Sequence, residues 1–401
     1  MKTATNDKRW VTEYPELDTG PVPVEPYVSP EYFDLERERI FKRLWLTVGR
    51  VDEIPKGGDY FIKDIEVSKT SVLVVRGRDG AIRGFHNLCR HRGNKVVKAC
   101  AGSTGGFSCG FHGWTYDLEG RLVYVPDEDQ FYDLKKSEHG LAPIATDVWK
   151  GFIFINADVS PTETLEEFMG ELGEQLSEYP FEGMQRVAMY SADVNVNWKV
   201  LLDAFQETYH GAVVHKRSAP DASKSKDNPF IHLLWVKLYR RHHMASVYAN
   251  PEHQPTAAES LAFKYGPTLV QGTEAKDALP PGVNPSRSPY WAFDEDVIFP
   301  NFFIAPANGW YFTYNFWPVA VNRTLWELKV YMNQAINAGE KISQEFSKVL
   351  LRDLTREDLN TLEDVQKGLA SGALTHIQLS DQEILIRHSQ KVVEDFVGAF
   401  K

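Results

Sequence analysis

The chain has 401 residues, of which 43% are hydrophobic and 25% are charged, and its formal net charge is −11. This composition predicts a folded protein with more than one domain, and the acidic balance argues against nucleic acid or an anionic membrane as the main partner. Three cysteines cannot form a disulfide framework, and no signal peptide or membrane span is predicted, so we expect a cytoplasmic protein.

Short strands dominate the first half of the chain, after one helix. Apolar residues recur at helical spacing over 30–44, and Ser29 is a favoured residue at the start of such a helix. Alternating apolar runs separated by turn residues predict strands and hairpins at 71–85, 116–124 and 151–156. We therefore predict a small all-β domain over 45–160, preceded by an N-terminal segment over 1–44.

Helices and strands are mixed in the second half, which we predict to be a further domain over 161–401. Its predicted elements are a helix over 163–178, a strand over 231–248, a meander of strands over 297–332 and helices from 341 onwards. The irregular stretch 250–290 is longer than an ordinary connection, and we expect it to form a lid over a functional site.

Two cysteines and two histidines stand in glycine-bearing loops of the predicted β domain. Cys89 and His91, then Cys109 and His112, give the pattern C-x-H-x17-C-x2-H. These residue types suit zinc or an iron–sulfur cluster, and in a Rieske centre two cysteines hold one iron of a [2Fe–2S] cluster while two histidines hold the other. The single residue between Cys89 and His91 argues against a structural zinc site, and the clustering argues against unrelated core positions. We therefore predict a Rieske cluster.

A second group of metal-ligand residues lies around His210 and His215. These two are five residues apart, so a regular helix would not bring them together, whereas a helix end or distortion near Gly211 would. A 2-His-1-carboxylate site needs one further acid, and our candidate is Asp358, which interrupts an otherwise apolar helical face. The alternative is structural, with Asp358 in a capping box that begins at Thr355.

The residues just upstream of His210 indicate a polar site next to an apolar pocket. Asp203 and Glu207 are four residues apart and share one predicted helical face. Phe205 between them is our candidate for contact with a substrate, together with Asp203. Four alternate aromatic residues share one face of a later strand, either as ordinary sheet core or as a wall for a hydrophobic substrate: Trp310, Phe312, Tyr314 and Phe316.

Together these motifs resemble those of the Rieske non-haem iron oxygenases, the catalytic alpha subunits of ring-hydroxylating and demethylating oxygenases. The matching segments are 89–93, 109–114, 197–199, 207–215 and 357–368. The chain departs from many relatives at Phe111 (often Tyr), Ala204 (often Asn) and Glu207 (often Asp). The resemblance implies an α+β fold, in which a small all-β Rieske module is joined to a helix-grip catalytic domain, an antiparallel sheet around a long helix.

The same resemblance implies the chemistry of the two sites. His210, His215 and Asp358 would bind Fe(II), and Glu207 would bridge His210 and a cluster histidine of a neighbouring subunit. The implied co-substrate is O2, with electrons from NAD(P)H through a ferredoxin or a flavin reductase. The implied assembly is a homotrimer or trimer-based, with or without a small beta subunit.

The implied reaction is hydroxylation of an aromatic or otherwise hydrophobic organic substrate by a terminal oxygenase component. The alternative within the family is N- or O-demethylation of a methylated or quaternary amine. Two non-catalytic alternatives account for less of the sequence. A Rieske electron-transfer protein leaves the second group of ligands unexplained, and a zinc-bearing binding module would be colourless, whereas a Rieske protein is red-brown.

Overall fold

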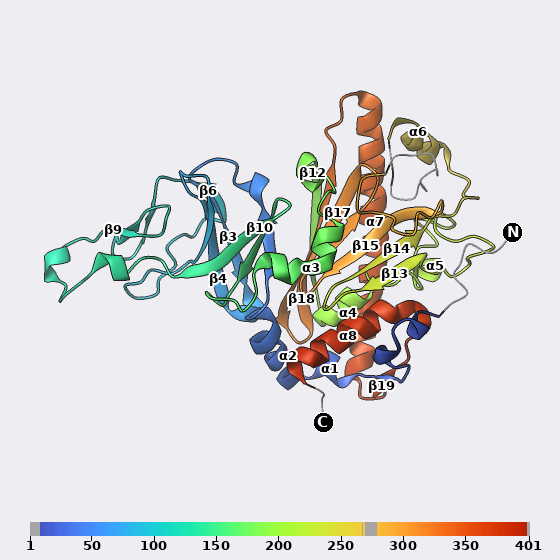
Figure 1. Cartoon of the computed structure of the whole chain (residues 1–401), viewed down its shortest axis with the longest axis horizontal. Coiled ribbons are helices and arrows are strands. Elements are labelled where there is room, and N and C mark those ends of the chain that lie inside the picture. The colour runs from blue at the N-terminus through green and yellow to red at the C-terminus, as the bar shows by residue number, and fades with distance from the viewer. Residues whose placement is uncertain (1–8, 267, 269–278, 399–401) are drawn as a thin grey trace. The chain divides into compact units, whose positions relative to one another are not determined.

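The structure is a computed structural model that describes residues 9–266, 268 and 279–398. The chain divides into two compact units, one formed by residues 37–168 and the other by residues 1–36 together with 169–401 (Figure 1). Among the helices in the described part of the chain, none is both long and apolar enough to cross a membrane.

The unit formed by residues 37–168 is built mainly from strands. One sheet has the order β2-β11-β10-β5-β4-β3-β6, and a small sheet has the order β7-β8-β9. The strands are β2 (Leu46–Arg50), β3 (Asp59–Ile65), β4 (Thr70–Arg76), β5 (Ile82–His86), β6 (Ala101–Ser103), β7 (Phe107–Ser108), β8 (Thr115–Tyr116), β9 (Leu122–Tyr124), β10 (Pro143–Trp149) and β11 (Phe152–Asn156). The predicted small all-β module is confirmed.

The hairpin predicted over 71–85 anchors the loops that carry the cysteines. Strands β4 and β5 pair antiparallel, and Gly80 in their turn has φ +84°, a backbone conformation that favours glycine. The buried core of this unit includes Leu73 from β4 and continues to Cys89 and Cys109. The two cysteine loops therefore begin on the packed side of the sheet.

The other unit contains an antiparallel sheet in the order β12-β18-β17-β16-β15-β14-β13. Its strands are β12 (Gln185–Val194), β13 (Trp235–Leu238), β14 (His243–Tyr248), β15 (Trp291–Ile298), β16 (Phe302–Pro306), β17 (Trp310–Ala320) and β18 (Arg323–Met332). The predicted meander is confirmed. The single strand predicted over 231–248 is wrong, because the chain reverses where the Tyr239 N–H donates to the His242 carbonyl (2.9 Å), which gives two strands.

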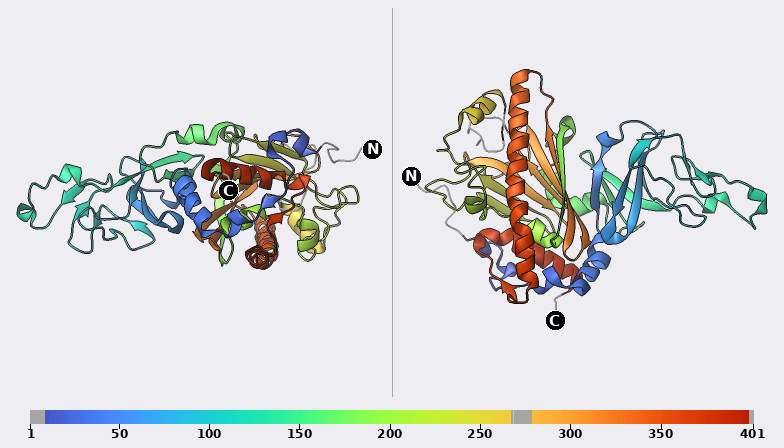
Figure 2. Two further views of the ribbon diagram at one scale, coloured as in Figure 1. Left: turned by 90° about the horizontal axis from the view of Figure 1, so that it is seen from below. Right: turned by 180° about the vertical axis from the view of Figure 1, so that it is seen from behind.

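A long helix, α7 (Ala338–Ala370), runs across one face of this sheet (Figure 2, right). Its N-cap is Asn337, so Thr355 lies in the helix interior, where its hydroxyl donates to the Leu351 carbonyl at 2.9 Å. The capping-box alternative for Asp358 is therefore wrong. The predicted arrangement of an antiparallel sheet around a long helix is confirmed.

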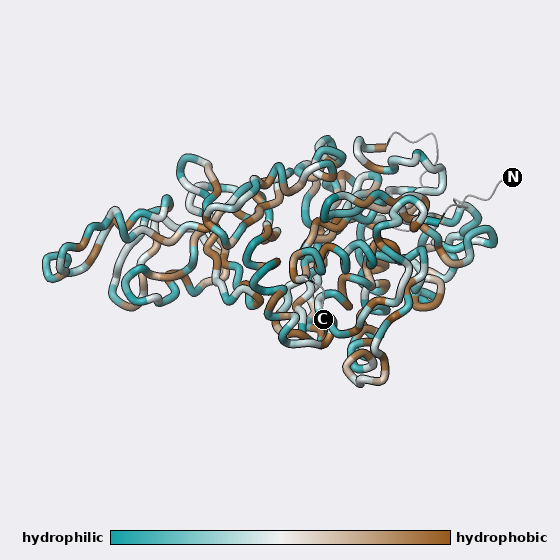
Figure 3. The backbone as a smooth tube through the Cα atoms, turned by 60° about the horizontal axis from the view of Figure 1, so that its bottom comes forward, coloured by the Kyte–Doolittle hydropathy of each residue, from teal (hydrophilic) through white to brown (hydrophobic). Residues whose placement is uncertain are grey.

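Shorter helices complete this unit. Helix α6 (Ala257–Tyr265) lies in the predicted lid stretch and packs against the start of α7, where Gly339 leaves room for the ring of Tyr265. Residues 267 and 269–278 of that stretch lie outside the described residues. Helix α8 (Ile384–Val397) packs its apolar face on β13 and β14. Hydrophobic and hydrophilic segments alternate along the backbone of both units, and several of the outermost loops are hydrophilic (Figure 3).

A buried pair of histidines joins α8 to the sheet. His243 of β14 and His388 of α8 place their Nδ1 atoms 3.2 Å apart, so one ring donates a proton that the other accepts. Both residues are buried, at 0% and 7% exposure. Burial lowers the pKa of His388 to about 4 and holds the pKa of His243 well below its usual range. The folded state therefore requires both rings to be neutral.

We expect acid to destabilise this unit through His388. Its usual pKa of 6.5 applies in the unfolded chain, so between pH 6.5 and 4 protons bind preferentially to the unfolded state. The stabilisation is complete above pH 6.5 and is lost as the pH falls towards 4, by about 3 kcal/mol. The urea midpoint of His388→Gln should fall less between pH 7 and pH 4.5 than that of the parent.

The matched control is the same exchange at His376, an exposed histidine that should leave the parental pH dependence unchanged. A His388→Gln variant with the parental dependence would show that His388 does not control the acid sensitivity.

Candidate metal centres and substrate cavity

Two loops of the β unit present the cysteines in the same way. In the first, the Cys89 N–H donates to the Asn94 carbonyl (2.8 Å) and the Gly93 N–H donates to the Cys89 carbonyl (2.9 Å). The Cys109 loop repeats both bonds at the same distances, with Gly113 in the place of Gly93. Both glycines have positive φ, +76° and +72°, which a side chain would disfavour. The spacing of each cysteine–histidine motif is therefore set by a tight turn.

The histidines of these loops lie side by side. The ring centroids of His91 and His112 are 4.7 Å apart, and His91 stacks on Trp114 at 4.9 Å with an interplanar angle of 7°. His91 Nδ1 is buried and has no hydrogen-bond partner among the described residues. The hydroxyl of Tyr116 lies 3.3 Å from Cys89 Sγ. Two thiols, two imidazoles and an unpaired ring nitrogen fit a Rieske [2Fe–2S] cluster, and the hydroxyl is placed to tune it.

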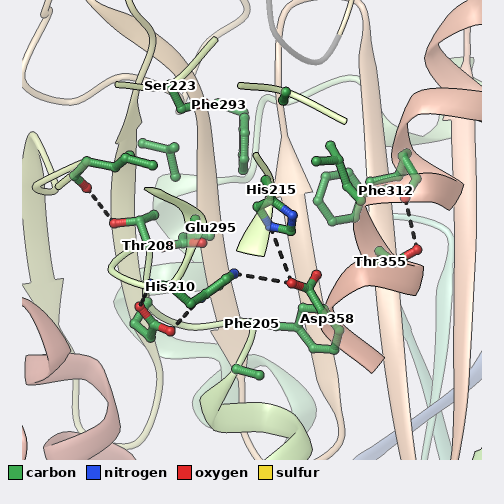
Figure 4. Close-up of a pocket in the computed structure, with 18 of the residues that line it drawn as sticks. Phe205, Thr208, His210, His215, Ser223, Phe293, Glu295, Phe312, Thr355 and Asp358 are labelled. Carbon is green, nitrogen blue, oxygen red and sulfur yellow. Dashed lines mark hydrogen bonds and ion pairs between the residues drawn. The ribbon is translucent and has the colours of Figure 1, made fainter. Parts of the chain in front are cut away.

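In the other unit, His210, His215 and Asp358 converge (Figure 4). Their ligand-type atoms all lie within 4.8 Å of one another. Asp358 Oδ1 is 3.3 Å from Nε2 of each imidazole, yet it makes no hydrogen bond of normal geometry with a described residue. Two imidazole nitrogens and a carboxylate oxygen directed at one point fit a 2-His-1-carboxylate metal site.

Local backbone geometry explains why the two histidines meet. They flank the four-residue helix α5 (Gly211–Val214), with His210 at its N-cap and His215 at its C-cap. The helix distortion predicted near Gly211 is thus present as a single short turn. Asp358 approaches from the middle of α7, the buried side of which it shares with Leu351 and Leu362.

Each imidazole of this group is also held by a second carboxylate. His210 Nδ1 lies 2.5 Å from Glu207 Oε1, and His215 Nδ1 lies 3.1 Å from Glu357 Oε2. Bonds of this kind fix the tautomer and leave Nε2 free to bind a metal. Although burial lowers the pKa of His210, the carboxylates of Asp358 and Glu207 raise it to about 10. A metal ion at this position would therefore displace a proton.

The remaining motif residues hold these elements in place. Asn197 caps helix α4 (Trp198–Asp203) with its side chain, and its N–H donates to Gln366 Oε1 on α7 at 2.7 Å. Lys199 forms an ion pair with Glu36, and both side chains are buried. The segment that leads to the histidines is thereby fixed to the helix that carries Asp358. Sequence analysis missed Glu36, whose only signal was a carboxylate among the apolar residues of the first helix.

A cavity of about 140 Å³ opens beside the three converging side chains. Phe205, the predicted substrate contact, lines it, and its ring centroid lies 4.5 Å from that of Tyr314. Phe312 and Tyr314 of the aromatic strand also face this cavity, whereas Trp310 and Phe316 are buried outside its lining. Both interpretations of that strand therefore apply, each to a different pair of residues.

Sequence analysis missed an acidic residue in the cavity wall. Glu295 on β15 lines the cavity and is 6% exposed, and its Oε1 has no hydrogen-bond partner among the described residues (Figure 4). Burial, with a smaller contribution from Glu207, raises the pKa of Glu295 to about 8. The signal was available in the run 294–296, because three consecutive carboxylates in a strand place at least one on each face.

Asp203 does not line this cavity. Helix α4 ends at Asp203, so Asp203 and Glu207 do not share the helical face that the sequence predicted. The Asp203 carboxylate accepts hydrogen bonds from the Tyr27 hydroxyl (2.6 Å) and Gln206 Nε2 (2.9 Å). It lines a second cavity of about 300 Å³ that also reaches Glu207. The same second cavity is lined by His210 and Asp358, so the contact of Asp203 with a substrate stays a prediction.

Two known protein families match this chain, one over the part that carries the cysteine loops and one over the part that carries His210, His215 and Asp358. The family described as "Rieske [2Fe-2S] domain" matches residues 44–144. The family described as "Ring hydroxylating alpha subunit (catalytic domain)" matches residues 181–399, which is more than half of the chain. The chain is a Rieske oxygenase alpha subunit.

Two curated relatives and one solved structure illustrate the membership of this Rieske oxygenase in its family. The carnitine monooxygenase oxygenase subunit of Acinetobacter pittii is 25% identical over 349 residues, which cover 86% of this chain and 84% of the relative. Biphenyl 2,3-dioxygenase subunit alpha of Rhodococcus jostii is 38% identical over 162 residues, 40% of this chain and 35% of the relative. The structure of a quaternary ammonium Rieske monooxygenase has the same fold, with a TM-score of 0.74 at 22% identity, and the match covers 95% and 97% of the two chains.

Membership defines the class of reaction and the cofactors. Rieske oxygenases are oxidoreductases that use O2, a [2Fe–2S] cluster and a mononuclear iron, with electrons from NAD(P)H through a reductase. This chain is the terminal oxygenase component of such a system. Alpha subunits of the family work with reductase and ferredoxin partners and form multimers.

Proposed function

We propose that His210, His215 and Asp358 bind the mononuclear iron. The convergence of two Nε2 atoms and one carboxylate oxygen supports this assignment, as do the second carboxylates on both Nδ1 atoms. We further propose that the cluster is bound by Cys89, His91, Cys109 and His112, whose matching loops and adjacent rings support it.

When bound, Fe(II) supplies open coordination positions for dioxygen, and the cluster supplies a further electron. Glu207 and Glu357 each hold one imidazole in the tautomer that presents Nε2 to the metal. Glu207 also keeps the Nδ1 proton of His210 in a fixed position. The aromatic wall around Phe205 excludes water and keeps an apolar substrate beside the reacting position.

The lining of the cavity best fits a small hydrophobic organic molecule as the substrate, which the enzyme oxygenates. The observation that carries this proposal is the aromatic cavity, because its lining includes the three iron-binding candidates themselves. Aromatic hydroxylation is compatible with this lining, and a relative that matches part of the chain is a biphenyl dioxygenase.

A second candidate is oxidative demethylation of a methylated or quaternary amine. Glu295 favours it, because a buried carboxylate among aromatic rings suits a cation better than it suits a neutral hydrocarbon. A relative that matches 86% of the chain is a carnitine monooxygenase oxygenase subunit. Both candidates use the same iron and the same cavity.

We also propose a homotrimeric or trimer-based ring in which electrons pass between subunits. His112 is exposed at the end of its loop, and the side chain of His210 is 25% exposed next to Glu207. An electron passing from the cluster to the iron would leave at His112 and arrive at His210, and both histidines are accessible from outside their own unit. Glu207 would connect His210 to the cluster histidine of a neighbouring subunit, and a ferredoxin or flavin reductase would recharge the cluster.

The test is turnover with a surrogate reductase, NADH and labelled dioxygen, on a panel of aromatic compounds and methylated amines. We expect label in the product for hydroxylation, or released formaldehyde with a demethylated product for the second candidate. Iron-depleted protein is the control. NADH consumption without oxygen transfer to any member of a broad panel would contradict the proposed cavity function.

A further inference from the structure

The face of β15 that lines the cavity carries one acidic residue. Phe293 and Glu295 point into the cavity, since residues two apart on a strand share a face, and Asp294 and Asp296 point to the opposite side. Opposite Glu295 on β14 is Ala245, whose small side chain leaves the carboxylate uncovered. The Glu295 carboxylate is therefore directed into the space beside the iron site.

Among the buried carboxylates of β15, Glu295 is the one that lines the cavity, since Asp296, whose oxygens also lack a hydrogen-bond partner among the described residues, points to the opposite side with Asp294. Asp294 accepts hydrogen bonds from Ser246 Oγ (2.6 Å), the Asn284 N–H (2.7 Å) and Trp291 Nε1 (2.7 Å). By contrast, Glu295 Oε1 is buried without a hydrogen-bond partner among the described residues. Leaving such a group unpaired is costly, so a partner supplied by a ligand would offset that cost.

The other two carboxylates of the cavity lining are already engaged. Glu207 holds His210, and Asp358 faces both imidazoles. Glu295 is the acidic residue of the lining that faces neither imidazole, and a cation bound beside it would favour its ionised form.

The rest of the lining selects the kind of ligand. It contains no Lys or Arg within the described chain, so an anionic group has no favourable contact there. Five aromatic rings surround the space, from Phe205, Phe293, Phe303, Phe312 and Tyr314. The faces of aromatic rings attract cations, and methyl groups pack against the same faces.

We propose that Glu295 and these rings recognise a positively charged, methylated amine group of the substrate. The proposal rests on the proposed function, because it takes the cavity beside the iron as the substrate site. Glu295 is then the residue that determines specificity between a cationic substrate and a neutral one of the same shape.

Choline and its uncharged isostere 3,3-dimethylbutanol provide the test, because they differ in one charge and hardly in shape. Isothermal titration calorimetry on the iron-loaded protein under argon measures the Kd of each ligand for the parent and for Glu295→Gln. We expect the ratio of the two Kd values to change by at least about tenfold in favour of the neutral ligand when the charge is removed.

Two controls separate charge from folding. Glu295→Gln should bind 3,3-dimethylbutanol within a few-fold of the parent, and Glu295→Asp should retain part of the preference for choline. An unchanged ratio in Glu295→Gln would overturn the proposal, and so would a parent that binds neither ligand. A changed ratio without oxygen transfer to any compound leaves the cation site standing and instead contradicts the proposed function of the cavity.

Discussion

Replacement of Asp358 by alanine is expected to remove the mononuclear iron and to leave the Rieske cluster in place. Two imidazoles alone hold a ferrous ion weakly, because the carboxylate supplies both the third ligand and the compensating charge. The cluster ligands belong to another compact unit with its own core, so their loops should not be affected. Turnover should fall by about 1,000-fold or more, since the metal supplies several kcal/mol to catalysis.

Iron analysis and visible absorption measure this result together. The parent should contain about three iron atoms in each chain, two in the cluster and one mononuclear, and Asp358→Ala should contain about two with an unchanged cluster spectrum. A graded series on α7 provides the controls. Asp364→Asn changes an exposed carboxylate and should retain all the iron. Glu357→Gln weakens the support of His215 and should lower iron affinity about 10- to 100-fold. Three iron atoms in Asp358→Ala would refute the assignment of this ligand.

Replacement of Glu207 by glutamine is expected to slow turnover by about 100-fold while both metal centres remain loaded. The amide oxygen of glutamine still accepts the proton of His210 Nδ1, so the orientation of the imidazole is kept. The charge of the carboxylate is lost, and with it the charged connection to the cluster of the neighbouring subunit. The defect should therefore lie in electron transfer and not in iron binding.

Single-turnover reoxidation of the reduced cluster, followed by its colour, measures this step directly. Hydrogen peroxide provides the control, because it is dioxygen that already carries two electrons and two protons. Turnover supported by peroxide should be close to the parental level in Glu207→Gln and absent in Asp358→Ala. Mixed trimers of Asp358→Ala and a cluster-free Cys109→Ser variant should regain about a quarter of the activity by random pairing, if electrons cross between subunits. A Glu207→Gln enzyme with parental cluster reoxidation would contradict the relay.

The parts of the sites that could be predicted are those in which the ligand residues and the residues that shape their loop lie close together in the sequence. Cys89 and Cys109 each lie in a tight loop that is closed by a glycine four residues further on, so the sequence motif alone indicates the shape of the loop. His210 and His215 could be paired for the same reason. Asp358 is far away in the chain, yet its position on a buried helical face made it visible as a carboxylate that required a partner.

Residues whose roles depend on long-range packing could not be predicted in this way. Glu36 meets Lys199 only because the fold brings together two residues that lie 163 positions apart in the chain. Glu295 faces the cavity only because the register of β15 places the preceding and following aspartates on the other side. Asp203 lines a different cavity from Phe205, which the sequence could not show because it did not reveal where α4 ends.

Helix α7 imposes a strict constraint on insertions and deletions. Over little more than two turns it presents Asp358 to the proposed iron site, Glu363 to the backbone of Asn195 (3.0 Å) and Gln366 to the backbone of Asn197 (2.7 Å). Adding one residue to an α-helix rotates everything beyond it by about 100°. Inserting or deleting one residue between 358 and 366 would thus break the hydrogen bonds that α7 makes to residues 195–197, just before α4. The same change beyond 366 would leave all three contacts intact.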